Sequence, residues 1–286
     1  MIIFGGSAST KFAQRVSKSA DAEYGLIDHR LFPDGEHYMR ILSPVKGKDC
    51  AVIQTTKTND AIVELLLLLD TLNDLGAESI HTVMPYMGYS RQDKVFNAGE
   101  SFSAKTILKL LDQYSDSITT INCHFLDYAG VFDFASVKIR NLDAFPLVAS
   151  FFKDKVKSPI IVSPDDGALE YAKKAAEIIG CEFVCLEKKR LSDHNVVVSA
   201  ADLNVAGKDA IILDDMISTG GTIIEAARFL RKEGAKSVRA GCVHGVFSRG
   251  VDVFKGVVDE LVCTDTIPGK VSKITVADLI AKDLPR

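Results

Sequence analysis

Apolar positions along the chain follow two alternating patterns. Short runs rich in β-branched residues, typical of strands, alternate with longer stretches in which apolar residues recur every three or four positions, typical of helices. The predicted strands cover residues 1–4, 50–55, 80–84, 117–122, 160–163, 183–187, 210–213, 238–243 and 260–264. The predicted helices cover residues 10–19, 60–75, 104–114, 144–155, 169–179, 222–233 and 276–281. This alternation indicates an α/β fold with mainly parallel sheets flanked by helices.

Glycines and wholly apolar strands support this interpretation. Gly76, Gly180 and Gly234 follow predicted helices, where a left-handed residue commonly ends the helix. The strand at residues 160–162 is apolar at every position, as expected for a parallel sheet covered on both faces. A boundary near residues 141–144 divides the chain into two strand–helix series of similar size. We therefore expect two domains, residues 1–143 and 144–286.

Composition and charge exclude several classes of protein. The 286 residues are 47% hydrophobic and 25% charged, with a net charge of −4, which speaks against a nucleic-acid partner. The longest apolar run, residues 62–69, contains Glu64 and is far shorter than the ~20 residues of a membrane span. Cys181 and Cys185 stand four apart without a second pair or a histidine cluster to complete a zinc site. With no secretory signal at the start of the sequence, we expect reduced cysteines, no membrane association and a cytoplasmic location.

The strongest chemical signal is the segment IILDDMISTGGT, residues 211–222. A buried strand is predicted to end at Leu213, followed by the adjacent carboxylates Asp214 and Asp215 and a glycine-rich turn that opens a helix. Ligands of open α/β sheets bind beyond the carboxyl ends of strands, and a helix N-terminus attracts phosphate. A capped tight turn alone needs neither paired acids nor two glycines. We predict a phosphate held by Ser218, Thr219, Gly220, Gly221 and Thr222, with the two carboxylates beside ribose hydroxyls or a Mg²⁺-bound water.

This segment resembles the phosphoribosyl pyrophosphate-binding motif of type I phosphoribosyltransferases and ribose-phosphate pyrophosphokinases. Two further segments distinguish these families. FPDGEH, residues 32–37, is an acidic turn, and YSRQDK, residues 89–94, lies in a predicted loop of ~15 residues, long enough to suggest a function. Together they are similar to the ATP-binding segments of ribose-phosphate pyrophosphokinases, which simple phosphoribosyltransferases do not carry.

Three more segments extend the resemblance to nearly the whole chain. His124 follows a predicted strand in INCHFLDYAGVFD, where the family has a metal-linked histidine, and Asp165 in SPDDGA matches a metal contact of the pyrophosphate loop. Taken alone, the former is an ordinary strand-end histidine and the latter part of a helix cap. In EKKRLSDHN, Lys188 and Arg190 match the catalytic pair of a mobile loop, with Lys189 as a spacer; alone, such a charge run is a solvated face.

The resemblance implies two phosphoribosyltransferase-like domains and the reaction of ATP with ribose 5-phosphate, assisted by Mg²⁺ near His124 and Asp165. Lys188 and Arg190 would be catalytic, with Arg190 also contacting ribose 5-phosphate alongside Asp214, Asp215 and the turn 218–222. The implied ATP-binding residues are Phe32, Asp34, Gly35, Glu36, Arg91 and Gln92. ATP segments near subunit contacts imply a homo-oligomer of at least two copies.

Departures from the family pattern and two alternatives complete the sequence interpretation. Ala168 stands where a second glycine is usual, Thr-Gly-Gly-Thr replaces the commoner Thr-Ala-Gly-Thr, and the length is closer to the short archaeal form. The runner-up function is a phosphoribosyltransferase that consumes phosphoribosyl pyrophosphate. A non-catalytic regulatory partner or nucleotide-sensing RNA binder on the same scaffold is disfavoured by the retained Lys188, Arg190, His124 and Asp165.

Overall fold

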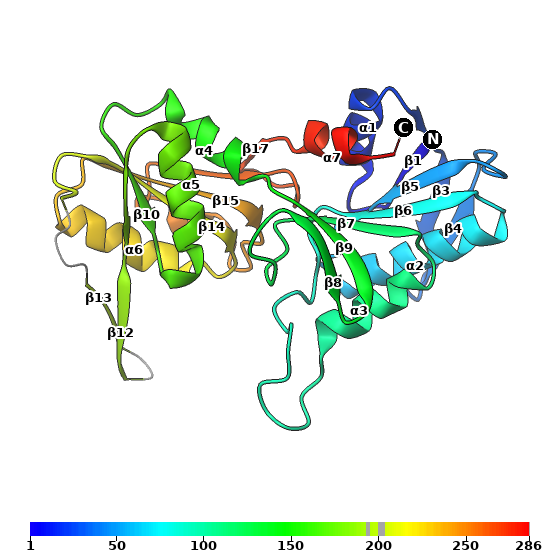
Figure 1. The fold of residues 1–286 in the computed structure, drawn as a ribbon, viewed down its shortest axis with the longest axis horizontal. Helices are drawn as coiled ribbons and strands as arrows, with labels where there is room; N and C mark the ends of the chain where they lie inside the picture. Colours follow the sequence, from blue (N-terminus) through cyan, green and yellow to red (C-terminus); the bar gives the residue numbers. More distant parts are fainter. Residues whose placement is uncertain (193–194, 200–203, 286) are drawn as a thin grey trace. The chain divides into compact units, whose positions relative to one another are not determined.

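The computed structural model describes residues 1–192, 195–199 and 204–285, which form two compact units. The first unit contains Met1–Asp143 together with the segment that begins at Val276, and the second contains Ala144–Thr275. Figure 1 shows both units in sequence colours. The expected C-terminal domain, residues 144–286, therefore differs from the second unit by its final segment, which packs with the first.

The first unit is built on a seven-stranded sheet with the order β2-β1-β5-β6-β7-β9-β8. All neighbouring strands are parallel except β8 and β9, which are antiparallel. Its strands are β1 (Ile2–Gly5), β2 (Glu23–Tyr24), β5 (Asp49–Ile53), β6 (Ser79–Met84), β7 (Ser117–Ile121), β8 (Gly130–Phe134) and β9 (Val137–Leu142). The strand order reverses between β1 and β5.

Helices cover both faces of this sheet. The crossovers β1–α1–β2 and β5–α2–β6 run in opposite directions across the sheet, so right-handed connections place α1 (Thr10–Ser19) opposite α2 (Asn59–Asp74). Leu65 and Leu69 of α2 pack with Phe4 and Val52 of the strands, and Leu108 of α3 (Ser103–Asp112) joins the same core. The apolar strand positions therefore lie between two helical layers.

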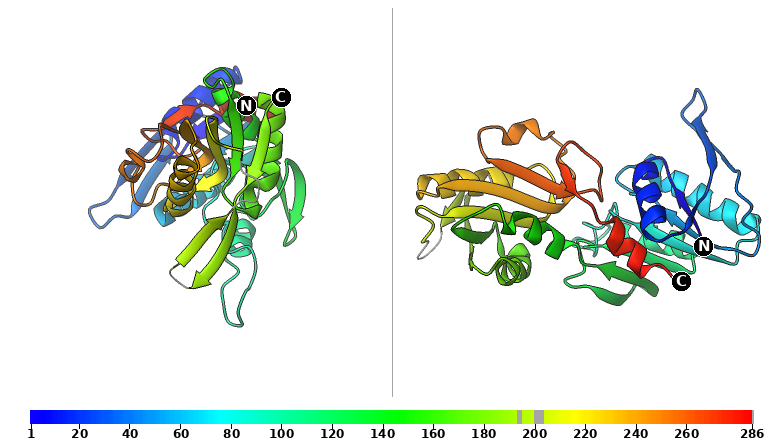
Figure 2. Two further views of the ribbon diagram at one scale, coloured as in Figure 1. Left: turned by 90° about the vertical axis from the view of Figure 1, so that its left-hand side faces the viewer. Right: turned by 90° about the horizontal axis from the view of Figure 1, so that it is seen from above.

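The C-terminal helix α7 (Ala277–Asp283) is fastened to the first unit by contacts far apart in sequence. It packs against α1, and the Asp283 carboxylate accepts hydrogen bonds from Arg140 of β9 and, at 3.4 Å, from Thr119 of β7. Figure 2 shows the helix in red beside the blue α1. A helix this short is stable only when it docks, and its local pattern does not indicate where it docks.

The second unit contains a six-stranded parallel sheet with the order β11-β10-β14-β15-β16-β17 among its described residues. The strands are β10 (Pro159–Ser163), β11 (Glu182–Cys185), β14 (Asp209–Ile217), β15 (Ser237–Gly245), β16 (Glu260–Thr264) and β17 (Ser272–Ile274). The helices are α4 (Phe145–Lys153), α5 (Leu169–Ile179) and α6 (Gly221–Lys232), with short 3-10 turns η1 (Asp166–Ala168) and η2 (Asp252–Phe254).

Alternate residues of these strands face different helices. Ile160, Val162 and Ile212 belong to the core that contains Ala226 and Leu230 of α6. On the other face, a Cβ at Gly241 of β15 would lie 2.8 Å from the Phe152 ring of α4. The wholly apolar strands of the sequence are thus buried on both faces, and the parallel α/β fold class is confirmed.

Two antiparallel ribbons stand outside the main sheets. One is formed by β3 (Ile27–Leu31) and β4 (His37–Ile41), and the other by β12 (Glu187–Ser192) and β13 (Asn195–Ser199). The sequence pattern predicted strands at neither place. Among the described residues, no helix is both long enough and apolar enough to cross a membrane.

Candidate active site

The carboxyl ends of β10 and β14 lie side by side at the point where the strand order of the second sheet reverses. From β10 the chain crosses to β11 on one side, and β14 lies on the other side of β10. Such a switch point leaves a crevice in which ligands of open α/β sheets bind. We call residues 163–168 and 214–222 the carboxyl edge of the second sheet. It contains Asp165 and all of the residues predicted to bind ribose 5-phosphate except Arg190.

Strand β14 is longer than the sequence predicted. The expectation was a strand that ends at Leu213, but β14 continues to Ile217, and Asp214 pairs with Cys242 of β15. The reason is that β15 itself extends to Gly245 and offers partners to Asp214, Met216 and Ile217. Asp214 and Asp215 therefore sit on a hydrogen-bonded strand rather than in a loop, which fixes their backbone positions.

At this edge, burial and neighbouring acids raise the pKa of one carboxyl group, that of Asp214. Burial, followed by the charges of Asp215 and Asp165, raises the pKa of Asp214 well above its ordinary value. The backbone N–H of Asp215 donates to Asp214 Oδ1 at 2.9 Å and opposes part of that effect. Acidic groups from the ends of two strands thus disfavour the charged form of Asp214. A cation, or a ligand rich in hydroxyl donors, would reduce this effect.

The turn after β14 depends on one of its two glycines. Gly220 has φ +83°, a left-handed conformation, and a Cβ there would lie 2.4 Å from the Phe254 ring, so both backbone and packing require glycine. At Gly221 an added Cβ would meet nothing closer than Thr219 Oγ1 at 3.8 Å. Gly221 therefore leaves open space beside the first turn of α6, whose N–H groups point along the helix axis toward an incoming anion.

Residues 247 and 248, in a loop that the sequence analysis did not single out, support this turn through backbone hydrogen bonds. The N–H of Phe247 donates to the carbonyl of Ile217 at 3.1 Å, and the N–H of Ser248 donates to the carbonyl of Ser218 at 3.0 Å. Phe247 has φ +42°, a conformation uncommon for a side chain with a Cβ. Local pattern does not reveal this support, because it depends on two segments thirty residues apart in sequence.

Asp165 lies on a tight turn between β10 and η1. Ser163 Oγ donates to the Asp165 carbonyl at 2.6 Å, and the Ala168 N–H donates to the same carbonyl at 3.3 Å. An added Cβ at Gly167 would lie 3.3 Å from Asp165 Oδ1, so glycine gives the carboxylate room. The predicted metal contact is therefore held at the same edge as Asp214.

The predicted catalytic pair lies on the ribbon that follows β11. Lys188 pairs with Val198 and Arg190 with Val196, with Lys189 between them on β12. The segment expected to be a loop thus has the backbone of an antiparallel hairpin. The side chains of Lys188 and Arg190 lie outside the part of the chain that the structure describes, so their roles remain predictions.

The other predicted residues belong to the first unit. His124 is exposed, three residues after the end of β7. Its loop is anchored by Asn122, which has φ +38° and donates to Asp143 Oδ1 at 2.9 Å, and by the Cys123 N–H, which donates to Asn141 Oδ1 at 2.9 Å. The structure therefore places His124 at the carboxyl end of a strand, as the sequence predicted.

The acidic turn predicted to bind ATP forms the tip of the β3–β4 hairpin. The Gly35 N–H donates to the Phe32 carbonyl at 2.9 Å, Gly35 has φ +94°, and the Glu36 N–H donates to Asp34 Oδ1 at 3.2 Å. The Phe32 side chain is 46% exposed and stands edge-on to the ring of Tyr38. The tip thus presents an aromatic ring beside two carboxylates.

Arg91 and Gln92 lie in residues 85–102, between β6 and α3. Gln92 Nε2 donates to the Lys94 carbonyl at 3.2 Å and to Glu100 Oε2 at 3.4 Å. Hydrogen bonds from Asn97 lower the pKa of Glu100, which also accepts from the Phe96 N–H. The views of Figures 1 and 2 place this loop and the β3–β4 tip on different parts of the unit, so one chain does not bring the two predicted ATP segments together.

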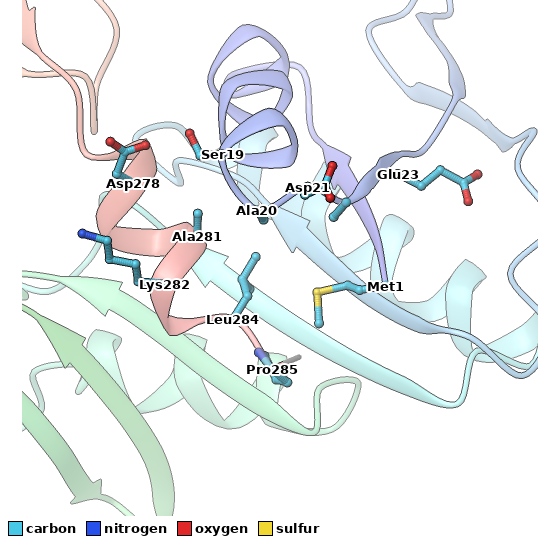
Figure 3. A pocket seen from close by; sticks show the side chains of 11 residues that line it. Met1, Ser19, Ala20, Asp21, Glu23, Asp278, Ala281, Lys282, Leu284 and Pro285 are labelled. Atoms are coloured by element: carbon cyan, nitrogen blue, oxygen red, sulfur yellow. The ribbon is translucent and has the colours of Figure 1, made fainter.

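One pocket of the first unit is unrelated to these residues. It has a volume of about 510 Å³ and lies where the segment after α1 meets α7 (Figure 3). Met1, Asp21, Glu23, Asp278 and Lys282 are among its lining residues. None of the described residues that line it is a predicted site residue, and it arises from the docking of the C-terminal helix.

Comparisons with known proteins agree with this geometry. Residues 142–275 match the phosphoribosyl transferase domain, so the fold and the carboxyl edge of the second sheet define a protein of the phosphoribosyltransferase-like class. Residues 1–114 match the N-terminal domain of ribose phosphate pyrophosphokinase. The chain belongs to the ribose-phosphate pyrophosphokinase family.

Individual relatives align with almost the full length of this chain. The chain is 41% identical over 288 residues to the ribose-phosphate pyrophosphokinase of Methanothermobacter thermautotrophicus, covering 98% of each chain. It is 39% identical over 279 residues to ribose-phosphate pyrophosphokinase 2 of Archaeoglobus fulgidus, covering 97% of each. The crystal structure of phosphoribosylpyrophosphate synthetase from Mycobacterium smegmatis superposes with a TM-score of 0.84 at 28% identity, covering 99% of this chain and 96% of that one. The family resemblance inferred from the motifs is confirmed.

Proposed function

We propose that the chain transfers the β,γ-diphosphoryl group of ATP to the 1-hydroxyl of D-ribose 5-phosphate for nucleotide biosynthesis. The hydroxyl oxygen bonds to the β-phosphorus, the bond from that phosphorus to the α-phosphate oxygen breaks, and AMP leaves with 5-phospho-α-D-ribose 1-diphosphate as the other product. The observation that carries this proposal is the carboxyl edge of the second sheet in a chain that belongs to this family along nearly its whole length.

The sugar phosphate is assigned to the turn that opens α6. A 5-phosphate fits the open space at Gly221, where helix N–H groups and the hydroxyls of Ser218, Thr219 and Thr222 supply donors. Gly220 shapes the turn. The carboxylates of Asp214 and Asp215 then accept hydrogen bonds from the ribose hydroxyls, which offsets the mutual repulsion that raises the pKa of Asp214.

ATP is assigned to the two segments of the first unit. Phe32 would stack on adenine, with Asp34, Gly35 and Glu36 at the same hairpin tip and with Arg91 and Gln92 from the other loop. Because these segments lie apart in one chain, we propose that a second copy supplies one of them, so that the enzyme is a homo-oligomer of at least two copies. Exposed apolar side chains on and beside the hairpin, Leu26, Leu31 and Leu42, support burial against another chain.

Mg²⁺ is the metal that suits this chemistry. It favours oxygen ligands and keeps several waters, and the like-charged acids Asp165, Asp214 and Asp215 offer oxygens where a cation would relieve their repulsion. We propose Asp165 and His124 as metal contacts, directly or through water. When bound, Mg²⁺ would neutralise charge on the phosphates of ATP.

Lys188 and Arg190 are proposed to stabilise the charge that develops on the transferring group and on the departing AMP, with Arg190 also meeting the sugar phosphate. Phosphoryl-type transfer is loose in most analyses, so positioning and charge neutralisation supply most of the catalysis. No dedicated general base is assigned.

The test is direct product analysis. Purified full-length protein is incubated with Mg²⁺, ATP and ribose 5-phosphate, and the nucleotides are separated by chromatography, with a control that omits the sugar. We expect AMP to appear only with the sugar and in amounts equal to the new diphosphate ester. Release of ADP would instead indicate single-phosphoryl transfer. AMP formation from adenine and phosphoribosyl pyrophosphate without ATP would establish a phosphoribosyltransferase and overturn the proposal.

Two further proposals concern where and with what the protein acts. The expected partners are its small-molecule substrates, not nucleic acid or a membrane, in keeping with the net charge of −4. A cytoplasmic location is consistent with six cysteines that are all free among the described residues. An inactive protein that bound RNA tightly at moderate salt would contradict the proposed partners.

A further inference from the structure

A cluster of metal-ligating side chains lies in the first unit, away from the carboxyl edge of the second sheet. His29 of β3, His37 of β4 and Glu64 of α2 each place one ligand atom within 4.8 Å of the others. His29 Nε2 lies 2.9 Å from His37 Nδ1 and 3.9 Å from Glu64 Oε1. The two imidazole rings are stacked, with centroids 5.2 Å apart.

The hairpin register brings the two histidines together. His29 pairs with Met39, and His37 pairs with Leu31, so the histidines occupy diagonal positions on the same face of the ribbon. Strand β4 packs against α2, which carries Glu64 in its second turn. Three separate elements thus converge on one point; His37 is the last residue of the segment FPDGEH, whereas His29 and Glu64 lie outside the motifs recognised in the sequence.

Glu64 is oriented by a shell of donors. Its side chain is 2% exposed; Ser7 donates from its N–H to Oε1 at 2.7 Å and from its hydroxyl to Oε2 at 2.5 Å. Gln54 Nε2 donates to Oε2 at 2.7 Å, while the side-chain oxygen of Gln54, Oε1, is buried without a partner. Supporting donors of this kind fix ligand carboxylates in metal sites. They leave the side of Oε1 that faces His29 to accept a further bond.

Two residues that donate to Glu64 lie just beyond strands of the first sheet. Ser7 follows β1 and Gln54 follows β5, the two strands between which the order of the first sheet reverses. A pocket of about 340 Å³ opens there, with Ser7, His29 and Glu64 among its lining residues. The pocket therefore gives a ligand or water access to His29 and Glu64.

We propose that His29, His37 and Glu64 bind one divalent transition-metal ion, with Zn²⁺ as the best match. Two imidazoles and a carboxylate suit Zn²⁺ and its neighbours, whereas Mg²⁺ favours oxygen ligands. Metal–nitrogen bonds of about 2.0–2.1 Å in a tetrahedral site set ligand atoms roughly 3.3 Å apart, and the observed 2.9 and 3.9 Å lie on either side. Three protein ligands leave one position open toward the pocket.

Binding replaces one hydrogen bond and needs no other reactant. The proton now shared between His29 Nε2 and His37 Nδ1 moves, so that each neutral ring keeps its single proton on its other nitrogen, His29 on Nδ1 and His37 on Nε2. Both facing nitrogens then donate their lone pairs to the metal, and Glu64 Oε1 supplies the third ligand. The metal would join β3, β4 and α2 through bonds to side chains of all three.

One consequence rests on the proposed function. The turn 32–36, assigned to ATP, connects β3 to β4 between the two histidines. A metal that ties both strands to α2 would hold this turn in one orientation before ATP arrives. Preorganisation of this kind lowers the KM for the ligand without new contacts to it.

The experiment measures metal binding itself. Chelator-treated, dialysed full-length protein is titrated with Zn²⁺ in excess Mg²⁺ by calorimetry, and with Co²⁺ by visible absorption. We expect one ion per chain, and we expect His29→Gln and His37→Gln each to weaken binding by at least about 10–100-fold. His81→Gln is the matched control, because His81 lies in the same unit and is hydrogen-bonded to Ser79 and Ser117 instead.

Thermal unfolding of each variant first establishes that it is folded. Equal binding by wild type, His37→Gln and His81→Gln would overturn the site, as would the absence of binding by the wild type. A lower KM for ATP in the Zn²⁺-loaded wild type, absent in His37→Gln, supports the consequence for the turn, and an unchanged KM overturns that consequence alone. A protein that releases no AMP would contradict the proposed function while calorimetry still decides the metal site.

Discussion

Strand β14 begins at Asp209 and carries Asp214 in its carboxyl half, and the two aspartates have opposite surroundings. At the amino end, Asp209 accepts hydrogen bonds from Ser237 Oγ at 2.5 Å and from the N–H groups of Lys157 and Ser158 at 3.1 and 3.3 Å. Arg239 adds a cation at 3.6 Å. Burial alone would raise the pKa of Asp209, but these partners outweigh it and the pKa is lowered. In the carboxyl half, Asp214 faces other acids and its pKa is raised.

The same contrast extends across the second sheet. Asp259 and Glu260, at the amino end of β16, also have lowered pKa values, because donors and cations including Arg231 and Lys273 outweigh burial. The amino edge satisfies its charges within the protein. At the carboxyl edge, by contrast, burial and the charges of Asp215 and Asp165 raise the pKa of Asp214. Acids with lowered and raised pKa values are thus separated along one strand.

The largest effect should follow from removing a cation proposed to act at the carboxyl edge. Lys188→Ala or Arg190→Ala should lower kcat by roughly 10²–10³, as loss of a transition-state donor does, with little change in the KM for ATP. Steady-state kinetics with product analysis measures both. Lys189→Ala, the intervening residue, is the matched control and should retain its kcat. A loss confined to KM would make the ribbon a binding element and remove the catalytic assignment.

A smaller effect should separate the two aspartates of β14 by substrate affinity. Asp214→Asn removes a charged acceptor proposed for the ribose hydroxyls and should raise the KM for ribose 5-phosphate by about 10–100-fold, since hydrogen bonds to charged groups contribute about 1.5–3 kcal/mol. Asp209→Asn should leave that KM unchanged. Initial rates at varied sugar concentration give the comparison, and an unchanged KM in Asp214→Asn would remove this residue from the sugar site.

For folding stability the order of the two aspartates should be reversed, with the larger loss expected on substitution of Asp209. Asp209→Asn places an amide against two backbone donors and should cost about 1–3 kcal/mol of unfolding free energy, measured by denaturant titration. Because the folded-state pKa of Asp209 is lowered, its contribution is complete above the ordinary aspartate pKa and is lost as the pH falls through the lowered value. The deficit of the variant should therefore shrink in acid. If the loss of unfolding free energy did not change with pH, the substitution would act by disturbing packing and not by removing a charge.

The smallest effect concerns Asp214 and has the opposite sign. Its raised pKa means that the folded state favours the protonated form, so stability is complete below the ordinary pKa and is lost as the pH rises through the raised value. Asp214→Asn removes this loss and should raise the Tm of the ligand-free protein by roughly 2–4 °C, about 1 kcal/mol. Scanning calorimetry should find the gain larger at alkaline than at mildly acidic pH. Destabilisation by Asp214→Asn at every pH would contradict the comparison.

Much of the α/β framework could be predicted from local pattern. The helices at residues 10–19 and 169–179 begin and end as predicted, because each has a clear apolar face and Gly180 adopts the expected left-handed conformation. The two ribbons were missed for the opposite reason. A two-stranded ribbon outside a sheet buries little, so β3 shows no alternation of apolar and polar residues, and β12 begins with four charged residues.

The candidate site also contains parts that the local sequence predicts and parts that it does not. The motif at residues 211–222 was recognisable because its chemistry lies in consecutive residues, and the structure brings Asp165 to the same edge. The support of Ser218 by Ser248 and the cluster of His29, His37 and Glu64 were not predictable, since each joins segments distant in sequence. The pairing of β14 as far as Ile217 likewise depends on the length of its neighbour.

The return of α7 to the first unit makes the second unit an insertion. Residues 144–275 are one uninterrupted stretch, whereas the first unit is assembled from both ends of the polypeptide. A ribosome therefore finishes every described strand of the second sheet before it releases α7, the helix that packs with the first unit. Severing the chain at residue 143 would not yield two intact halves, because the leading fragment would lack α7 and the trailing one would carry it with nothing to cover.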